Sequence, residues 1–283
     1  GFPIAKIAAL LAIGYTLDEL QNDITKVTPA SFEPVIDYIV TKVPKFNFEK
    51  FQGTPNELNT AMKSVGEIMS IGRSFKESIL KAFYSIESDN YGFDITHRLL
   101  NFKNEDLKDE LSKQKPDRLI MVAEAIRRNF TLEEINSITH IDLFFLREIE
   151  EIIDIEKRIV QTQGNLDKEF LVHIKKIGFS NHHIASLAKV PVKNIYDLLI
   201  KNNLKPIFKR VDTCGNEFDS STAYLYSTFS ESINEFSCES RPDNRKKIII
   251  LGSGPNRIGQ GIEFDYCCVQ QLNPFKIWAI TQS

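Results

Sequence analysis

The chain has 283 residues, of which 42% are hydrophobic and 26% are charged; this length and composition predict two or three globular domains with apolar cores. The 35 Lys and Arg against 38 Asp and Glu give a net charge of −3, which excludes bulk electrostatic attraction to nucleic acid or to an anionic membrane. Apolar runs such as Ile7–Ile13 are far shorter than the roughly 20 residues of a membrane-spanning helix. The four cysteines, Cys214, Cys238, Cys267 and Cys268, are too few for a disulfide scaffold and form no C-x-x-C pair. We therefore expect a cytoplasmic protein with no metal site and with neither nucleic acid nor membrane as a partner.

Residues 1–87 carry the patterns of mixed α and β structure. Proline is favoured at helix starts, Ser or Thr three residues before Glu forms a capping box, and β-branched runs favour strands. These patterns predict, in chain order, a helix from Pro3 that Gly14 stops, a short helix opened by Thr16–Glu19, strands at Tyr38–Val43 and Val65–Ile71, and a helix opened by Ser74–Glu77.

Residues 88–205 predict consecutive helices. Only two glycines, Gly164 and Gly178, occur between Phe93 and Thr213, and apolar residues recur at helical spacing. About seven helices with short connections are expected, including Asp117–Arg128, a helix opened by the capping box Thr131–Glu134, Leu143–Val160, Leu166–Ile177, Ser180–Val190 and Val192–Asn202.

Residues 206–245 read as irregular, and Lys246–Leu251 has the pattern of a buried strand. It runs into a turn that contains Gly252, Gly254, Gly259 and Gly261. A strand, a glycine-rich turn and a helix are how many proteins bring backbone N–H groups to phosphate.

Neither common phosphate-binding motif fits that turn. Arg257 stands where a dinucleotide fingerprint needs glycine, and Gln260 stands where a P-loop needs lysine. Glu263 and Asp265, which follow the turn, suit the positive end of a helix and disfavour a bound anion. From the residues alone, a phosphate site and a structural turn or channel wall both remain open.

Three other features have a functional and a structural interpretation. Glu67 lies inside the apolar segment Met62–Arg73 and is either exposed at a sheet edge or deliberately buried. The five histidines have no convincing ligand spacing and are expected in surface or capping roles; they are His97, His140, His173, His182 and His183. Lys42, Lys45 and Lys50 alternate with Phe46, Phe48 and Phe51, an outline of a nucleic-acid stacking surface for which ordinary packing is the favoured interpretation.

Three segments resemble one family, the large subunit of carbamoyl phosphate synthetase. They are residues 1–46, residues Met62–Arg73, and the blocks Phe208–Cys214, Thr222–Thr228 and Leu251–Cys268. The resemblance covers about residues 1–270, whereas the segment from Gln271 onward departs from the family pattern. The family's large subunit consists of two ATP-grasp synthetase units with a helical oligomerisation domain between them.

The resemblance implies a mixed fold in three parts. Residues 1–87 would be the C-terminal part of the first ATP-grasp unit, an α+β tail. Residues 88–239 would be the all-α oligomerisation domain with an irregular linker. Residues 240–283 would begin the second unit, as the start of an α/β pre-ATP-grasp domain.

The resemblance also implies a function. The parent enzyme, an ATP-dependent ligase, makes carbamoyl phosphate from bicarbonate, glutamine-derived ammonia and two ATP, with Mg²⁺ or Mn²⁺ and K⁺. Its partners are a glutamine amidotransferase small subunit and further copies of itself through the helical domain. The ATP and metal ligands of both units fall outside this sequence, so no catalytic residue is expected in it and the chain alone is expected to be inactive. By motif position Glu67, Gly261 and Glu263 correspond to residues that line the carbamate passage. The alternative is a non-catalytic helical assembly module.

Overall fold

The computed structural model describes residues 2–46, 48, 53–86, 92–93, 102–215, 217, 224–230, 238–250 and 270. Within these ranges the fold is mixed, with nine helices and two antiparallel two-stranded sheets, as predicted. The elements are α1 (Ile4–Ala12), β1 (Ile39–Lys45), β2 (Gly66–Gly72), α2 (Phe75–Ser85), α3 (Asn104–Ser112), α4 (Arg118–Arg127), α5 (Leu132–Thr139), α6 (Leu143–Thr162), α7 (Lys168–Ile177), α8 (Asn181–Ala188), α9 (Val192–Lys201), β3 (Ile207–Arg210) and β4 (Leu225–Thr228). None of the described helices is both long and apolar enough to cross a membrane.

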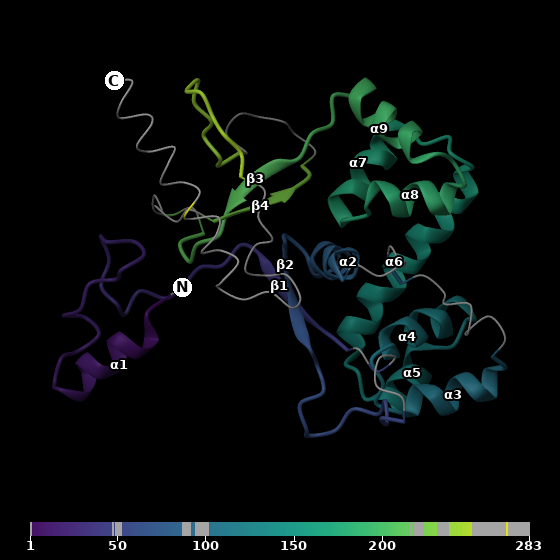
Figure 1. Cartoon of the computed structure of the whole chain (residues 1–283), viewed down its shortest axis with the longest axis horizontal. Helices are drawn as coiled ribbons and strands as arrows, with labels where there is room; N and C mark the ends of the chain where they lie inside the picture. Colours follow the sequence, from purple (N-terminus) through teal and green to yellow (C-terminus); the bar gives the residue numbers. More distant parts are fainter. Residues whose placement is uncertain are drawn as a thin grey trace.

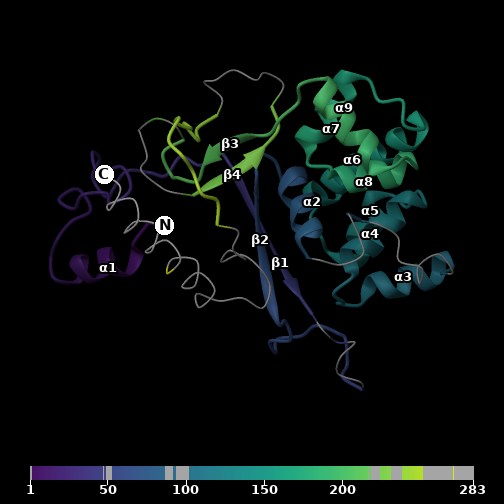
Figure 2. The ribbon, with the colours of Figure 1, turned by 45° about the horizontal axis from the view of Figure 1, so that its top comes forward.

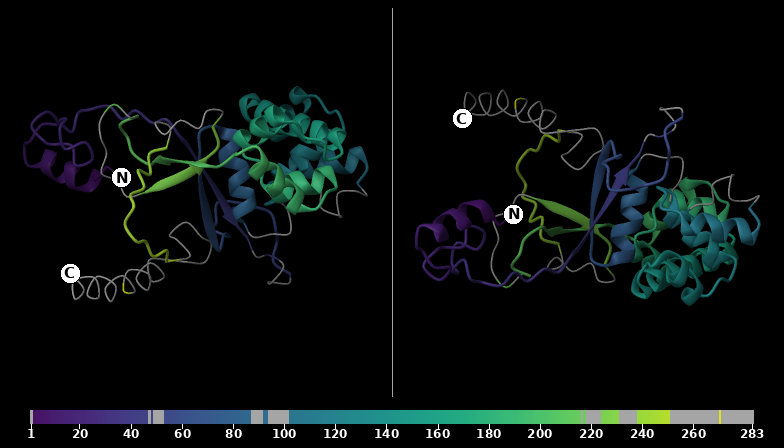
Figure 3. Two further views of the ribbon diagram at one scale, coloured as in Figure 1. Left: turned by 90° about the horizontal axis from the view of Figure 1, so that it is seen from above. Right: turned by 90° about the horizontal axis from the view of Figure 1, so that it is seen from below.

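Helix α1 and the loop that follows it form the N-terminal end of the molecule, on the side of the sheets away from helices α3–α9 (Figure 3). The short helix expected after Thr16 does not form. Glu19 does accept hydrogen bonds from the Thr16 N–H (2.8 Å) and hydroxyl (3.1 Å), but Ala30 N–H donates to the Leu20 carbonyl at 2.7 Å and Gln21 bridges to Pro29. These contacts draw the chain into a loop before a helical turn can propagate.

Strands β1 and β2 form an antiparallel ladder that pairs Ile39 with Gly72 and Lys45 with Gly66. One face of this ladder packs on α2, which lies between the sheet and helices α3–α9 (Figure 2). As predicted, Ser74 caps α2, because its side chain accepts the Glu77 N–H at 3.2 Å. Pro44 lies within β1, which a two-stranded sheet tolerates because each strand has a free edge.

Helices α3–α9 form one body around α6, which passes between α3–α5 and α7–α9 (Figure 1). The apolar stripe of α6 is fully buried in this body through Leu146, Ile149, Ile152, Ile153 and Ile159. The capping box of α5 is complete, with mutual hydrogen bonds of 3.1 and 3.0 Å between Thr131 and Glu134. The glycine-poor region is therefore helical, as the sequence predicts.

Residues 206–250 differ from the prediction in two ways. The stretch expected to be irregular contains the antiparallel pair β3 and β4, with Ile207 opposite Thr228. Lys246–Ile250, expected as a buried strand, forms no strand, and Ile248 and Ile249 are 62% and 82% exposed. A strand needs a neighbour to satisfy its backbone, and no described strand pairs with this segment. Leu251 lies outside the described residues.

Candidate functional site

Glu67 projects from the face of the β1–β2 sheet that points away from α2. Alternation along β2 buries Ile68 and Ser70 against the helix side and leaves Glu67 exposed. Its carboxylate pairs with the Lys42 ammonium at 2.7 Å, and the two side chains are 58% and 57% exposed. Of the two interpretations left open by the sequence, the exposed one is therefore correct for this chain.

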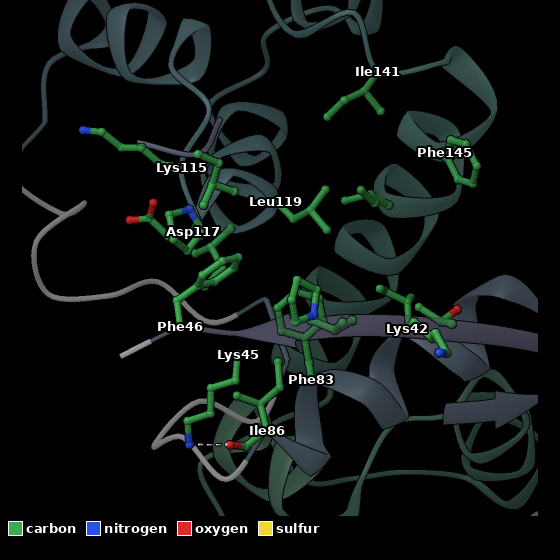
Figure 4. Close-up of a pocket in the computed structure, with 18 of the residues that line it drawn as sticks. Lys42, Lys45, Phe46, Phe83, Ile86, Lys115, Asp117, Leu119, Ile141 and Phe145 are labelled. Atoms are coloured by element: carbon green, nitrogen blue, oxygen red, sulfur yellow. Dashed lines mark hydrogen bonds between the residues drawn. The ribbon is translucent and has the colours of Figure 1, made fainter. Parts of the chain in front are cut away.

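The opposite face of the same sheet borders a cavity of about 630 Å³ (Figure 4). Its walls come from β1, α2, the start of α4 and the start of α6, so four segments distant in sequence enclose it. The lining is mainly apolar and includes Val43, Phe46, Phe75, Ile79, Phe83, Leu119, Ile120, Ile141, Phe145 and Ile149. Such a space can hold apolar groups; its ionisable lining groups are Lys42, Lys45, Lys115 and Asp117.

The polar groups at the border of this cavity have partners of their own. Lys42 pairs with Glu67, and Lys115 pairs with Glu110 at 2.5 Å. Lys45 donates to the Ile86 carbonyl at 3.2 Å, the dashed line in Figure 4. The ring of Phe46, which also borders the cavity, stacks on Phe48 with centroids 5.5 Å apart. These contacts support packing rather than base stacking for the described part of this Lys and Phe cluster; Lys50 and Phe51 lie outside it.

A second polar site lies where α2 meets α7 and β4. Glu77, only 1% exposed, accepts hydrogen bonds from the Arg73 N–H and the Lys81 ammonium, each at 2.7 Å. The Glu77 carboxylate thus accepts the Arg73 N–H, whereas a capping box would require it to accept the Ser74 N–H. Gly178 at the end of α7 has φ +110°, and a Cβ there would lie 2.8 Å from the Cα of Glu77. Helix α7 can approach α2 this closely only because residue 178 is glycine.

Next to this junction, Lys175 of α7 is 7% exposed. Burial, with a contribution from the nearby Lys81 charge, lowers the pKa of Lys175 to about 8. The sequence analysis did not single out this lysine. The sequence could have indicated its burial, because Lys175 follows Leu171 by four residues and so lies on the apolar stripe of α7.

The interior of the helical body holds a buried charged cluster, which the sequence analysis also missed. Arg127 of α4 donates to Glu156 of α6 at 2.6 Å and to the Phe93 carbonyl at 2.8 Å. His183 of α8 is fully buried, with its Nε2 3.4 Å from the other Glu156 oxygen. The expectation of a surface or capping role is therefore wrong for His183, whose side chain is buried although it lies in the first turn of α8. Arg127, Glu156 and His183 lie on three different helices. The spacing of residues along the sequence does not show that these helices are in contact.

Of the sequence-predicted site residues, the structure describes Glu67 only. Gly252, Gly254, Gly259, Gly261 and Glu263 lie outside the described residues, as does His97 among the histidines. In the part of the chain that the structure covers, no group of three or more His, Cys, Asp or Glu side chains could hold a metal ion.

The comparison with protein families gives two matches along the chain. Residues 67–203 match the oligomerisation domain of the carbamoyl-phosphate synthetase large chain. Residues 244–281 match the carbamoyl phosphate synthase preATP-grasp domain. The first match covers the helical body, and the second covers the glycine-rich segment.

Curated carbamoyl phosphate synthase large chains align with nearly the whole sequence. Those of Neisseria meningitidis serogroup A and Pseudomonas aeruginosa are each 51% identical, over 271 and 273 residues; that of Pasteurella multocida is 50% identical over 274 residues. The chain belongs to the carbamoyl phosphate synthase large chain family. The alignments cover 95% of this chain and 24–25% of those relatives, so the chain spans about a quarter of the length of the large chains it matches.

Proposed function

We propose that this chain is the central part of a carbamoyl phosphate synthase large chain. In this proposal residues 1–87 complete the first ATP-grasp unit, residues 88–239 are the oligomerisation domain and its linker, and residues 240–283 begin the second unit. The complete cytoplasmic enzyme makes carbamoyl phosphate from bicarbonate, glutamine-derived ammonia and two ATP, with Mg²⁺ or Mn²⁺ and K⁺, and pairs with a glutamine amidotransferase subunit. The observation that carries the proposal is the ordered pair of domain matches, with the helical one coinciding with the body around α6.

We also propose that the chain is inactive by itself. The chain spans about a quarter of the length of the large chains it matches, and in the described residues no group of three or more His, Cys, Asp or Glu side chains could hold a metal ion. The test is a bicarbonate-dependent ATPase and carbamoyl phosphate assay of this chain, with a complete large chain as positive control. No turnover above buffer is expected. Bicarbonate-dependent ATP hydrolysis by the purified chain would show that an ATP site is present and would overturn this part of the proposal.

For Glu67, Gly261 and Glu263 we propose a place on the wall of the passage for carbamate. The support from geometry concerns Glu67, whose carboxylate stands on the sheet face away from α2, beside Lys42. A polar wall suits a charged intermediate, because its charge would be costly to move past apolar groups. In the complete enzyme Gly261→Phe should block the passage, so that partial ATP hydrolysis continues while carbamoyl phosphate synthesis falls. Unchanged coupling between the two would contradict the wall role.

The second candidate function is assembly through the helical body. The amphipathic helix Leu143–Val160 suggests such a surface, but most of its apolar stripe is buried in the core of the helical body and is not available to a partner. An exposed apolar pair lies instead on α9, where Tyr196 and Ile200 are 47% and 77% exposed and four residues apart, hence on one helix face. We therefore place the contact between copies of the chain on this face of α9. Sedimentation of the chain and of Ile200→Glu tests it.

A further inference from the structure

Lys175 is held inside the junction between α7, α2 and β4, without an acidic partner among the residues that the structure describes. Its ammonium donates to the Phe179 carbonyl and to the Asn181 side-chain oxygen, both at 2.8 Å, and lies 4.8 Å from the centre of the Phe229 ring. No described carboxylate lies within ion-pair distance of it. Burying a cation without an anion costs free energy. Burial therefore favours the neutral amine of Lys175 over the ammonium form.

A small cavity of about 150 Å³ adjoins Lys175 and is also lined by Lys81, Ser180, Thr228 and Phe229. Lys81 already pairs with Glu77 at 2.7 Å. The cavity therefore gathers two ammonium groups against one buried carboxylate. The Thr228 hydroxyl is buried, and no described group hydrogen bonds to it. A small ligand with a negative charge would neutralise the excess positive charge, and a hydrogen-bond acceptor on it could bind the Thr228 hydroxyl.

The amine of Lys175 is also suited to act as a nucleophile. With its pKa lowered from 10.5 to about 8 by burial and by Lys81, a large fraction is unprotonated just above neutral pH. For a lysine with an ordinary pKa that fraction is roughly two orders of magnitude smaller. Only the unprotonated amine carries the lone pair that attacks an electrophile.

We propose that Lys175 binds carbon dioxide covalently and reversibly, as a lysine carbamate enclosed in this cavity. The Nζ lone pair forms a bond to the carbon of CO₂, one C=O π bond opens to place a negative charge on oxygen, and a proton leaves Nζ for water. One N–H remains to donate to the Phe179 carbonyl. The Asn181 amide, after turning its NH₂ group inward, and the Thr228 hydroxyl can donate to the new carboxylate.

Carboxylation changes the charge of the junction. Carboxylation converts the Lys175 cation into an anion, so that repulsion from Lys81 becomes attraction. With Glu77 still paired to Lys81, the junction changes from an excess of one positive charge to an excess of one negative charge, at the place where the buried hydroxyl and amide donors lie. A cavity of about 150 Å³ has room for CO₂. The proposal does not depend on the proposed function of the chain.

The test supplies ¹³C-labelled bicarbonate to the full chain with a blocked N-terminal amine and follows the carbamate resonance by NMR. One protein carbamate is expected, with an occupancy at fixed dissolved CO₂ that rises as pH increases through about 8. Alkylation with a trialkyloxonium salt followed by peptide mass spectrometry should locate it on Lys175. Lys175→Met should remove the resonance, and Lys176→Met, which changes the exposed neighbour, should retain it.

A second variant tests the proposal in case Lys175→Met does not fold. Thr228→Val preserves the size of the side chain but removes the proposed donor, and it should lower carbamate occupancy several-fold while the helical circular dichroism signal is unchanged. The proposal is overturned if wild-type chain shows no protein carbamate at saturating CO₂, or if the label maps to other lysines and persists in Lys175→Met.

Discussion

Replacing Glu156 by leucine should strongly destabilise the helical body. The Glu156 side chain is 5% exposed and joins α6 to α4 through Arg127 and to α8 through His183. Glu156→Leu removes the carboxylate and leaves the Arg127 guanidinium, whose side chain is 18% exposed, without its nearest counter-charge.

The size of the effect follows from what Arg127 retains. Breaking a buried pair by removing one partner typically costs about 3–5 kcal/mol. Arg127 keeps its hydrogen bond to the Phe93 carbonyl at 2.8 Å and a distant contact with Glu124 at 3.9 Å. Because these contacts remain, we expect the loss of unfolding free energy to lie near the lower end of that range, at about 3 kcal/mol.

The measurement is a urea titration followed by the helical circular dichroism signal. Asp154→Asn, in the same helix, is the matched control, because Asp154 is 60% exposed and pairs with Lys157 at the surface; it should cost less than about 1 kcal/mol. Combining Glu156→Leu with Arg127→Met removes the uncompensated charge and should recover part of the loss. A cost for Glu156→Leu no greater than that of the control would refute the interpretation of this cluster as a buried, paired charge.

Three further changes test separate parts of the fold. Ile153→Ala, at a fully buried site, should lower the unfolding free energy by about 2–5 kcal/mol, and a loss under about 1 kcal/mol in a urea titration would contradict the packing. Gly178→Ala should cost more than Gly164→Ala, because both have positive φ but the new Cβ would meet the Glu77 backbone at 178 and only the Val190 side chain at 164; thermal melts compare them. For Lys175, the folded pKa of about 8 lies below the ordinary 10.5, so the unfolded chain binds more protons between these values and stability rises with pH in that window. In CO₂-free buffer, Lys175→Met should lose this rise, and an identical pH profile for both proteins would refute it.

Local chemistry explains why the helices could be predicted. A cap or an apolar stripe involves residues three or four apart, so Ser74 and the Thr131–Glu134 box marked helix starts, and the stripe of α6 marked its buried face. Where a short-range pattern had a competing partner, prediction failed. Thr16 and Glu19 make the bonds of a capping box, but the loop closed by Leu20 and Ala30 replaces the helix.

The remaining features depend on contacts between distant segments. The four-residue strands β3 and β4 gain their ladder only by pairing with each other, and Lys246–Ile250 has strand composition without a described neighbour. The exposure of Glu67 was open until the register of β2 fixed its face. The 630 Å³ cavity and the burial of Lys175 arise where several elements meet, which no single stretch of sequence encodes.

The most direct test of the account is sedimentation velocity of the chain over a wide concentration range. If the helical body is an assembly module that uses the exposed pair on α9, the sedimentation coefficient of wild-type chain should rise with concentration. Ile200→Glu, at a side chain 77% exposed, should remain monomeric with an unchanged circular dichroism spectrum. A wild-type chain that stays monomeric at the highest concentration would contradict self-association, and association unaffected by Ile200→Glu would contradict the α9 surface.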